Sequence, residues 1–123
     1  MDIKLNVKVS IIDDTMGVIT INGELSIFVQ EFDLLYKELT AYIKMGLYQY
    51  VLDLNQVSYI DSSGIGMVIK LATNASKFNT QICILCDQPQ VRKALTISNV
   101  DKIVHYIKSV KEGSDYYKNT NIK

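Results

Sequence analysis

Residues 50–66 read YVLDLNQVSYIDSSGIG, and this stretch constrains the fold more than any other part of the chain. Its apolar first half predicts a buried strand, which leads through a short polar loop to Asp-Ser-Ser-Gly at 61–64, the start of a helix. The first turn of a helix has unpaired backbone N–H groups and carries the positive end of the helix dipole. Two interpretations remain open: these residues cap the helix, or a serine among them carries a phosphate, which such an environment tolerates.

The composition is that of one ordinary globular domain. The chain has 123 residues, 48% hydrophobic and 21% charged, so it can bury a core without disulfides or metals. Its 13 basic and 13 acidic residues cancel, and the lack of a basic stripe with interleaved aromatic residues argues against direct nucleic-acid binding. Apolar runs reach only about five residues, against the roughly 20 that span a bilayer, and the first residues lack a signal-peptide core. We therefore expect a cytoplasmic protein without membrane insertion.

Cys83 and Cys86 form a C-x-x-C pair, a spacing found in redox and zinc sites. They lie in a short apolar run at residues 81–87, which predicts a buried strand. Side chains three positions apart on a strand point to opposite faces, so the two sulfurs should diverge. The chain has no second cysteine pair, and its only histidine is His105. We expect buried structural cysteines, no disulfide, no metal site and no cofactor.

The N-terminal third predicts a hairpin followed by a helix. Residues 3–11 alternate apolar and polar side chains, which indicates a strand with one solvated face. Turn-forming residues at 13–17 lead to a second strand at 18–21, which residues 22–26 close. Apolar residues at spacings of four and three then predict an amphipathic helix that ends before Gly46. Its apolar stripe comprises Phe28, Phe32, Leu35, Leu39 and Tyr42.

The middle of the chain predicts a central strand and a second helix. Residues 48–54 are almost continuously apolar, as expected for a strand covered on both faces. Residues 63–78 predict a helix with a core stripe of Ile65, Val68, Ile69, Ala72 and Ala75, extended by Gly64, Met67, Leu71 and Phe78. This apolar arc is wider than packing on one sheet requires. Either neighbouring helices cover the excess, or part of the arc, including Met67, is a partner-binding surface.

The C-terminal third predicts three further elements. They are a strand at 81–86, a helix from Pro89 to about Ile97, and a last strand at 103–107. Residues 109–123 are polar and weakly patterned, which indicates a short helix at most, followed by a frayed tail.

The predicted fold class is α/β, with the element order β-β-α-β-α-β-α-β-(α). Crossover helices imply a mixed sheet of about five strands with parallel pairing at its centre. We divide the chain into a single domain, residues 1–112, and a polar C-terminal tail, residues 113–123.

The motifs do not favour an enzyme. A serine hydrolase requires a base within hydrogen-bond reach of its nucleophile, often with the elbow G-x-S-x-G. This chain offers Asp-Ser-Ser-Gly and His105, which we expect to pack within a strand. A P-loop nucleotide-binding enzyme requires G-K-[ST], which is absent from the sequence. We expect no catalytic residues.

Several short motifs occur in the predicted element order. They are NGEL at 22–25, DL at 53–54, DSSGIG at 61–66, PQVRKAL at 89–95 and NVDKI at 99–103. This combination closely resembles the STAS domains of anti-sigma factor antagonists, and the resemblance covers roughly residues 5–112. One position departs from the family pattern: Ser26 stands where the family usually has an aspartate after Gly-Glu-Leu.

The resemblance implies a function and a mechanism. In that family, a serine kinase that is also the anti-sigma factor uses ATP to phosphorylate the first serine of the motif, here Ser62. The unphosphorylated form binds the kinase and releases the sigma factor, and a metal-dependent serine phosphatase resets the phosphorylated form. The residues alone do not decide between Ser62 and Ser63. The alternative within the same fold is a scaffold module of a signalling assembly or a cytoplasmic subunit of a membrane transporter.

The resemblance also implies a partner-binding surface near the phosphoacceptor. Its residues are Gly23, Glu24, Ser26, Asp61, Ser63, Gly64 and Gly66. Gly64 and Gly66 carry no side chain, which would let a foreign backbone approach the first turn of the helix.

Overall fold

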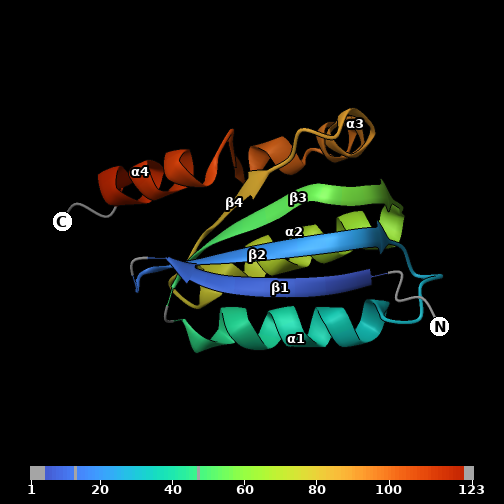
Figure 1. Ribbon diagram of the computed structural model, residues 1–123, viewed down its shortest axis with the longest axis horizontal. Coiled ribbons are helices and arrows are strands. Elements are labelled where there is room, and N and C mark those ends of the chain that lie inside the picture. Colours follow the sequence, from blue (N-terminus) through green and yellow to red (C-terminus); the bar gives the residue numbers. More distant parts are fainter. Residues whose placement is uncertain (1–4, 13, 47, 121–123) are drawn as a thin grey trace.

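The computed structural model describes residues 5–12, 14–46 and 48–120, and Figure 1 shows one sheet with helices packed around it. The elements are β1 (Leu5–Ile12), β2 (Met16–Leu25), α1 (Phe32–Met45), β3 (Gln49–Ile60), α2 (Ser62–Lys77), β4 (Ile82–Leu85), α3 (Pro89–Ile97), a short 3-10 helix (Val100–Lys102), β5 (His105–Ile107) and α4 (Val110–Thr120). The predicted α/β class and element order are confirmed, including the fourth helix.

The strands form one mixed sheet in the order β1-β2-β3-β4-β5. β1 pairs antiparallel with β2, as a hairpin must, whereas the pairs β2–β3, β3–β4 and β4–β5 are parallel. Parallel neighbours require crossover connections, which α1, α2 and α3 supply. β3 is the central strand predicted from residues 48–54. The short polar loop predicted before Asp61 is wrong, because β3 continues to Ile60 and its last residues pair with β2.

Helices cover both faces of the sheet. The larger core lies against α1 and α2, which pack on each other, and it includes Ile19, Leu52 and Ile84 from three neighbouring strands. Alternate strand residues, such as Val51 and Leu85, face the other side, where they pack with α4. In Figure 1, α1 lies beside β1, and α4 lies on the side of β3 and β4.

Helix α1 begins later than the apolar spacing predicts. Its buried residues are Phe32, Leu35, Leu39 and Ile43. Phe28 lies before the helix and is 93% exposed. Phe28 lies within a turn before α1, in which the backbone N–H of Val29 donates to the carbonyl oxygen of Ser26. The prediction that Phe28 and Tyr42 belong to the buried stripe is therefore wrong, because Tyr42 is also exposed.

Helix α2 matches the predicted helix at 63–78 but buries a different stripe. Its buried residues are Gly64, Met67, Val68, Leu71 and Ala75. Met67 and Leu71, predicted to extend the core stripe, lie at the centre of the buried face, whereas Ile69 is only half-buried. The wide apolar arc is explained by a neighbouring helix, because α2 packs against α1 as well as against the sheet.

The two cysteines lie on opposite sides of the sheet, as predicted. Both are buried and free. Cys83 packs with the residues beneath α4, and Cys86 packs in the larger core on the other face. Burial raises the pKa of both thiols, which is the behaviour of structural cysteines.

Helix α4 differs from the predicted polar tail. Residues 113–120 belong to this helix, and 121–123 lie outside the described residues. Tyr117 is buried, and its hydroxyl donates to a backbone carbonyl oxygen of β3. Gly113 allows close packing on the sheet, because a Cβ there would lie 2.7 Å from the Cδ1 atom of Ile107. These contacts fix a segment that its polar composition did not suggest was ordered.

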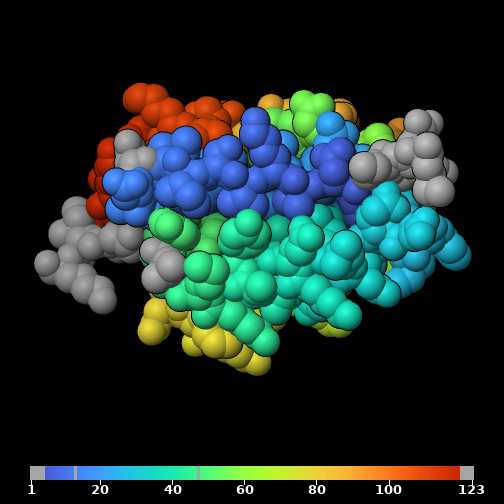
Figure 2. Space-filling model, turned by 60° about the horizontal axis from the view of Figure 1, so that its bottom comes forward, coloured from blue at the N-terminus to red at the C-terminus, as the bar shows by residue number. Residues whose placement is uncertain are grey.

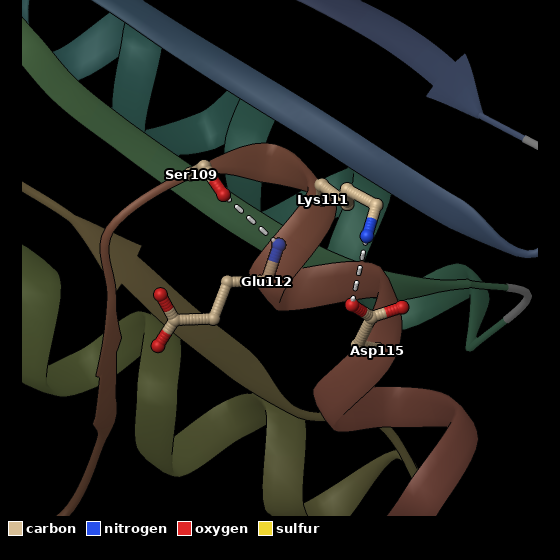
Figure 3. Close-up of polar contacts among 4 residues, drawn as sticks. All are labelled: Ser109, Lys111, Glu112 and Asp115. Carbon is tan, nitrogen blue, oxygen red and sulfur yellow. Dashed lines mark hydrogen bonds and ion pairs between the residues drawn. The ribbon is translucent and has the colours of Figure 1, made fainter.

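The start of α4 has a local capping pattern that explains why the helix forms. The backbone N–H of Glu112 donates to Ser109 Oγ at 3.0 Å, and the Glu112 carboxylate accepts from the backbone N–H of Lys108 at 3.0 Å. This is close to the reciprocal S-x-x-E capping box. Figure 3 shows the Ser109 contact and, one turn on, the exposed ion pair of Lys111 Nζ with Asp115 Oδ2 at 3.6 Å.

Candidate functional site

Asp61 caps helix α2. Its backbone is extended, and its Oδ1 atom accepts a hydrogen bond from the backbone N–H of Gly64 at 2.9 Å. Its carbonyl oxygen accepts the first bond of the helix, from the N–H of Ile65 at 3.0 Å. The capping interpretation of the motif is thus correct for Asp61. Both serines that follow lie inside the first turn of the helix.

The same carboxylate holds the loop between β2 and α1. Asp61 Oδ2 accepts hydrogen bonds from the Ser26 hydroxyl at 2.9 Å and from the backbone N–H of Ile27 at 3.2 Å. The Ser26 Oγ atom in turn accepts from the N–H of Phe28 at 3.2 Å. Ser26 is only 4% exposed, so its side chain is an internal link rather than a contact surface. An ionised aspartate at position 26 would have no proton to donate to Asp61.

Hydrogen bonding keeps the Asp61 carboxyl group charged. Burial raises its pKa, but donated hydrogen bonds outweigh burial, so the pKa lies below that of an ordinary aspartate. The donors are the N–H of Gly64, the Ser26 hydroxyl, and the N–H groups of Ile27 and Ser63. At neutral pH these bonds are therefore charge-assisted, and stronger than those between neutral partners.

Ser62 and Ser63 differ in exposure. Ser62 is the first residue of α2 and is exposed, whereas Ser63 is half-buried. Because Asp61 provides the cap, the Ser62 hydroxyl is not required for it. Its position at the positive end of the α2 dipole favours a negative group there. Of the two hydroxyls, that of Ser62 is the more accessible to another protein.

Three other residues of α2 assigned to the partner-binding surface lie at different depths. A Cβ on Gly64 would lie 2.3 Å from the carbonyl oxygen of Leu25, so this glycine makes room for the end of β2, not for a foreign backbone. Met67 is 2% exposed within the larger core, so its assignment to the surface is wrong: the packing of α1 on α2 buries it. A Cβ on Gly66 would meet no atom within 4 Å, so Gly66 remains the open position.

A family model matches this chain over nearly its whole length. The matching model is that of the STAS domain, and it covers residues 6–113. The chain belongs to the STAS domain family. A curated relative, the STAS-domain containing protein PA14_20770 of Pseudomonas aeruginosa (strain UCBPP-PA14), is 42% identical over 55 residues. That alignment covers 45% of this chain and 54% of the relative, so the match spans about half the length of the curated protein.

Solved structures share the STAS fold at low sequence identity. An anti-sigma factor antagonist from Mycobacterium paratuberculosis has a TM-score of 0.80 and 17% identity, covering 91% of this chain and 92% of that one. The anti-sigma factor antagonist SpoIIAA in its unphosphorylated form has a TM-score of 0.76 and 19% identity, covering 93% and 97%, and its phosphorylated form from Bacillus matches as well. The murine Slc26a9 anion transporter has a TM-score of 0.73 and 16% identity, covering 94% of this chain but 22% of the transporter.

Gly23 and Glu24 of this STAS domain lie at the same end of the sheet as Asp61. Gly23 has a φ of 121° and stands at a register shift between β2 and β3. Glu24 of β2 pairs with Tyr59 of β3, and each lies one position before the last residue of its strand. Ser26 directly follows the end of β2, and Asp61 directly follows the end of β3. Both predicted residues are half-buried, so they border the site without projecting from it.

Sequence reasoning missed two exposed apolar residues beside Asp61. Ile27 is 51% exposed and Phe28 is 93% exposed. Figure 2 shows the loop that carries them, coloured between blue and cyan, projecting at one end of the molecule. The apolar spacing placed Phe28 on a helix. The available signal against that placement was Ser26, a residue type that favours turns, just before it.

The geometry does not fit a serine hydrolase. His105 pairs with Cys83 of β4, and Cys83 pairs with Val51 near the start of β3. Ser62 follows the opposite end of β3, so the two side chains lie far apart. At about 3.3 Å per strand residue the separation is roughly 30 Å, too far for a nucleophile and its base. His105 instead stacks on Tyr116, with ring centroids 4.1 Å apart.

Two other kinds of site find no support in residues 5–12, 14–46 and 48–120. In these ranges no group of three histidine, cysteine or acidic side chains is placed to hold a metal ion. No helix in the same part of the chain combines the length and apolar character that a membrane span requires.

Proposed function

We propose that this STAS domain is an anti-sigma factor antagonist whose partner binding is switched by phosphorylation of Ser62. The observation that carries the proposal is the exposed Ser62 in the first turn of α2, directly after the capping residue Asp61. The unphosphorylated form binds a serine-kinase anti-sigma factor in the cytoplasm, so that the sigma factor is freed. It acts on transcription through this protein partner and makes no direct contact with nucleic acid.

The kinase transfers the γ-phosphoryl group of ATP to Ser62. A bond forms between Ser62 Oγ and phosphorus as the bond to the β-phosphate oxygen breaks, ADP leaves, and the hydroxyl proton passes to a base on the kinase. A serine phosphatase later hydrolyses the ester, which restores the Ser62 hydroxyl and releases inorganic phosphate. The STAS domain itself supplies only the acceptor, with no cofactor and no catalytic group.

A phosphate on Ser62 changes binding while leaving the fold intact. In the free protein, an anion at the start of α2 gains roughly 0.3–1 kcal/mol from the helix dipole. In a closely fitted interface the same phosphate, with nearly two negative charges, must lose its water, at a cost of several kcal/mol. A loss of only about 1.4 kcal/mol already weakens binding tenfold.

The partner covers the surface around Ser62. Gly66 offers an open backbone position one turn along α2, and Ser63 lies half-buried beside the acceptor. Gly23 and Glu24 border the same end of the sheet. SpoIIAA, a solved antagonist with this fold, exists in unphosphorylated and phosphorylated forms, which supports the proposed kind of switch.

Two substitutions of Ser62 test the proposal. Ser62→Asp should fold with a stability close to that of the wild type but bind the kinase at least tenfold more weakly. Ser62→Ala should bind like the unphosphorylated wild type and accept no phosphate. The assays are calorimetric binding to the kinase identified by pull-down, and mapping of the phosphate by mass spectrometry. Equal binding of Ser62→Asp and wild type, or a phosphate on Ser63 alone, would refute the switch.

A second candidate function is a cytoplasmic STAS unit of a membrane transporter or a scaffold of a signalling assembly. The observation in its favour is the match to Slc26a9, in which a STAS fold forms part of a far longer chain. The two functions differ in what the purified wild type retains from an extract of its own cells. An ATP-dependent serine kinase supports the antagonist, whereas a membrane protein retained equally by Ser62→Asp supports the second function.

A further inference from the structure

We propose that Phe28, held near Ser62 by the hydrogen bond between Ser26 and Asp61, is the apolar anchor through which the Ser62 kinase binds this chain. The inference rests on the proposed function. It adds to that function the residue of this chain that contacts the kinase and the apolar character of that contact. The kinase presents an apolar pocket at the border of its active site, and the Phe28 ring fills it.

The first observation is the exposure of Phe28. Phenylalanine is among the residue types most often found buried, yet this ring is 93% exposed. Ile27 beside it is 51% exposed, which widens the apolar surface. In the described part of the chain, no large apolar side chain is more exposed than Phe28. Figure 2 shows its loop standing out from the end of the molecule.

The second observation is that this exposed loop is fixed in place. The N–H of Phe28 donates to Ser26 Oγ at 3.2 Å, and the Ser26 hydroxyl donates to Asp61 Oδ2 at 2.9 Å. The N–H of Ile27 donates to the same carboxylate oxygen at 3.2 Å. Val29, the next residue, is buried in the larger core. An aromatic residue on a loop already ordered costs less entropy to bind than one on a mobile loop.

The third observation is the position of the loop relative to the acceptor. Ser62 follows Asp61 directly, and Asp61 bonds to the loop backbone at Ile27. In-line transfer requires the kinase to seat the γ-phosphate of ATP against Ser62 Oγ. A kinase that acts on the folded chain therefore covers the surface next to Asp61. Aromatic residues inside such a footprint commonly carry most of the binding energy.

Ser26 has a positioning role in this arrangement. It does not contact the partner, because it is buried, but its side chain joins the Phe28 backbone to the residue that precedes the acceptor. If Ser26 loses its hydroxyl, Asp61 Oδ2 keeps only the hydrogen bond from the Ile27 N–H among the contacts described. Phe28 then loses its link to Asp61.

The test compares the kinetics of Ser62 phosphorylation in matched variants. Purified wild type, Phe28→Ala, Phe28→Leu and Ile97→Ala are titrated into an extract of their own cells supplied with ATP. The initial rate of phosphate incorporation at Ser62 is measured by mass spectrometry. Ile97 is the matched control, because it is 70% exposed and lies at the end of α3.

We expect Phe28→Ala to raise KM at least tenfold and to change kcat less than twofold, because the anchor serves binding and not transfer. Phe28→Leu should give an intermediate KM, and Ile97→Ala should match the wild type. Wild-type kinetics in Phe28→Ala would overturn the inference and leave the proposed function standing. No phosphate on Ser62 of the wild type would overturn both.

The role of Ser26 has its own readout. In Ser26→Ala, hydrogen exchange of the Phe28 amide should accelerate at least tenfold, and KM for Ser62 phosphorylation should rise in the same direction as in Phe28→Ala. Combining Ser26→Ala with Phe28→Ala should add little to the KM of Phe28→Ala alone, since both changes remove the same contact. Faster exchange with an unchanged KM would show that loop order does not matter for binding and would refute the positioning role.

Discussion

Removal of the Asp61 carboxylate should lower the free energy of unfolding by about 3 kcal/mol. The α2 cap, through the bond from the N–H of Gly64, contributes about 1 kcal/mol. The bonds from the Ser26 hydroxyl and the Ile27 N–H join a charged acceptor, and each adds roughly 1 kcal/mol once partial exposure is allowed for. The variant that measures the sum is Asp61→Ala, in urea unfolding followed by circular dichroism.

Two variants separate the parts of this loss. Asp61→Asn keeps a capping oxygen but removes the charge, so it should lose about half as much as Asp61→Ala. Ser62→Ala, at an exposed position that does not provide the cap, should lose less than about 0.5 kcal/mol. If Asp61→Ala unfolds within about 0.5 kcal/mol of the wild type, or Ser62→Ala costs as much as Asp61→Ala, the assigned hydrogen bonds do not hold this end of the molecule.

The same experiment has a defined pH dependence. Asp61 has a lower pKa in the folded chain than its ordinary value of 3.8, so the folded state binds this proton more weakly than the unfolded state. Its stabilisation is complete above the unfolded pKa and is lost as the pH falls through the folded pKa. The stability difference between wild type and Asp61→Asn should therefore be constant above about pH 6 and shrink at acid pH.

Two further substitutions test the packing of α2. Gly64→Ala should lower the free energy of unfolding by at least about 2 kcal/mol, because its methyl group would lie 2.3 Å from the Leu25 carbonyl oxygen. Gly66→Ala should be neutral or stabilising by up to about 1 kcal/mol. Equal losses for the two variants in urea unfolding would contradict this packing. Met67→Lys should cost at least about 3 kcal/mol, because it places an unpaired charge in the larger core. A calorimetric Tm close to that of the wild type would instead place Met67 at the surface.

The sequence predicts the fold well because the determining signals are local. Alternation in β1, the apolar run in β3 and the proline at the start of α3 each act within one element, and the crossover rules then give the parallel pairing. At the C-terminus the sequence predicted a short helix at most, and the structure has α4 from Val110 to Thr120. The capping contacts of Ser109 and Glu112 stabilise the start of α4, and their spacing is visible in the sequence. The polar composition of the residues after them nevertheless suggested a frayed tail. The packing of Gly113 and Tyr117 is nonlocal and could not be seen in the sequence.

From the residue pattern alone, the cap of α2 could be predicted, because its residues are contiguous, whereas Gly23, Glu24 and Ser26 were expected near it only from the family resemblance. Asp61 and Ser62 belong to one motif, and the cap of α2 follows from their order. The width of the apolar arc could not show whether Met67 faces a partner or α1, because periodicity gives a direction and not a neighbour. Phe28 was placed in a helix for the same reason: spacing alone could not reveal the turn that holds it outside the core.

The meeting of Ser26 with Asp61 follows from the register of two parallel strands. β2 and β3 end side by side, with Leu25 paired to Ile60, so the residues that follow them lie opposite each other. Two register shifts bring this about, because each gives β3 one residue more than β2. With the register of the pair Thr20 and Asp53 kept to the end, Ser26 would face Tyr59, and Asp61 could not hold the loop that carries Phe28. Two strand irregularities, and not the Asp-Ser-Ser-Gly motif alone, therefore place the loop that carries Phe28 beside Asp61, the residue before Ser62.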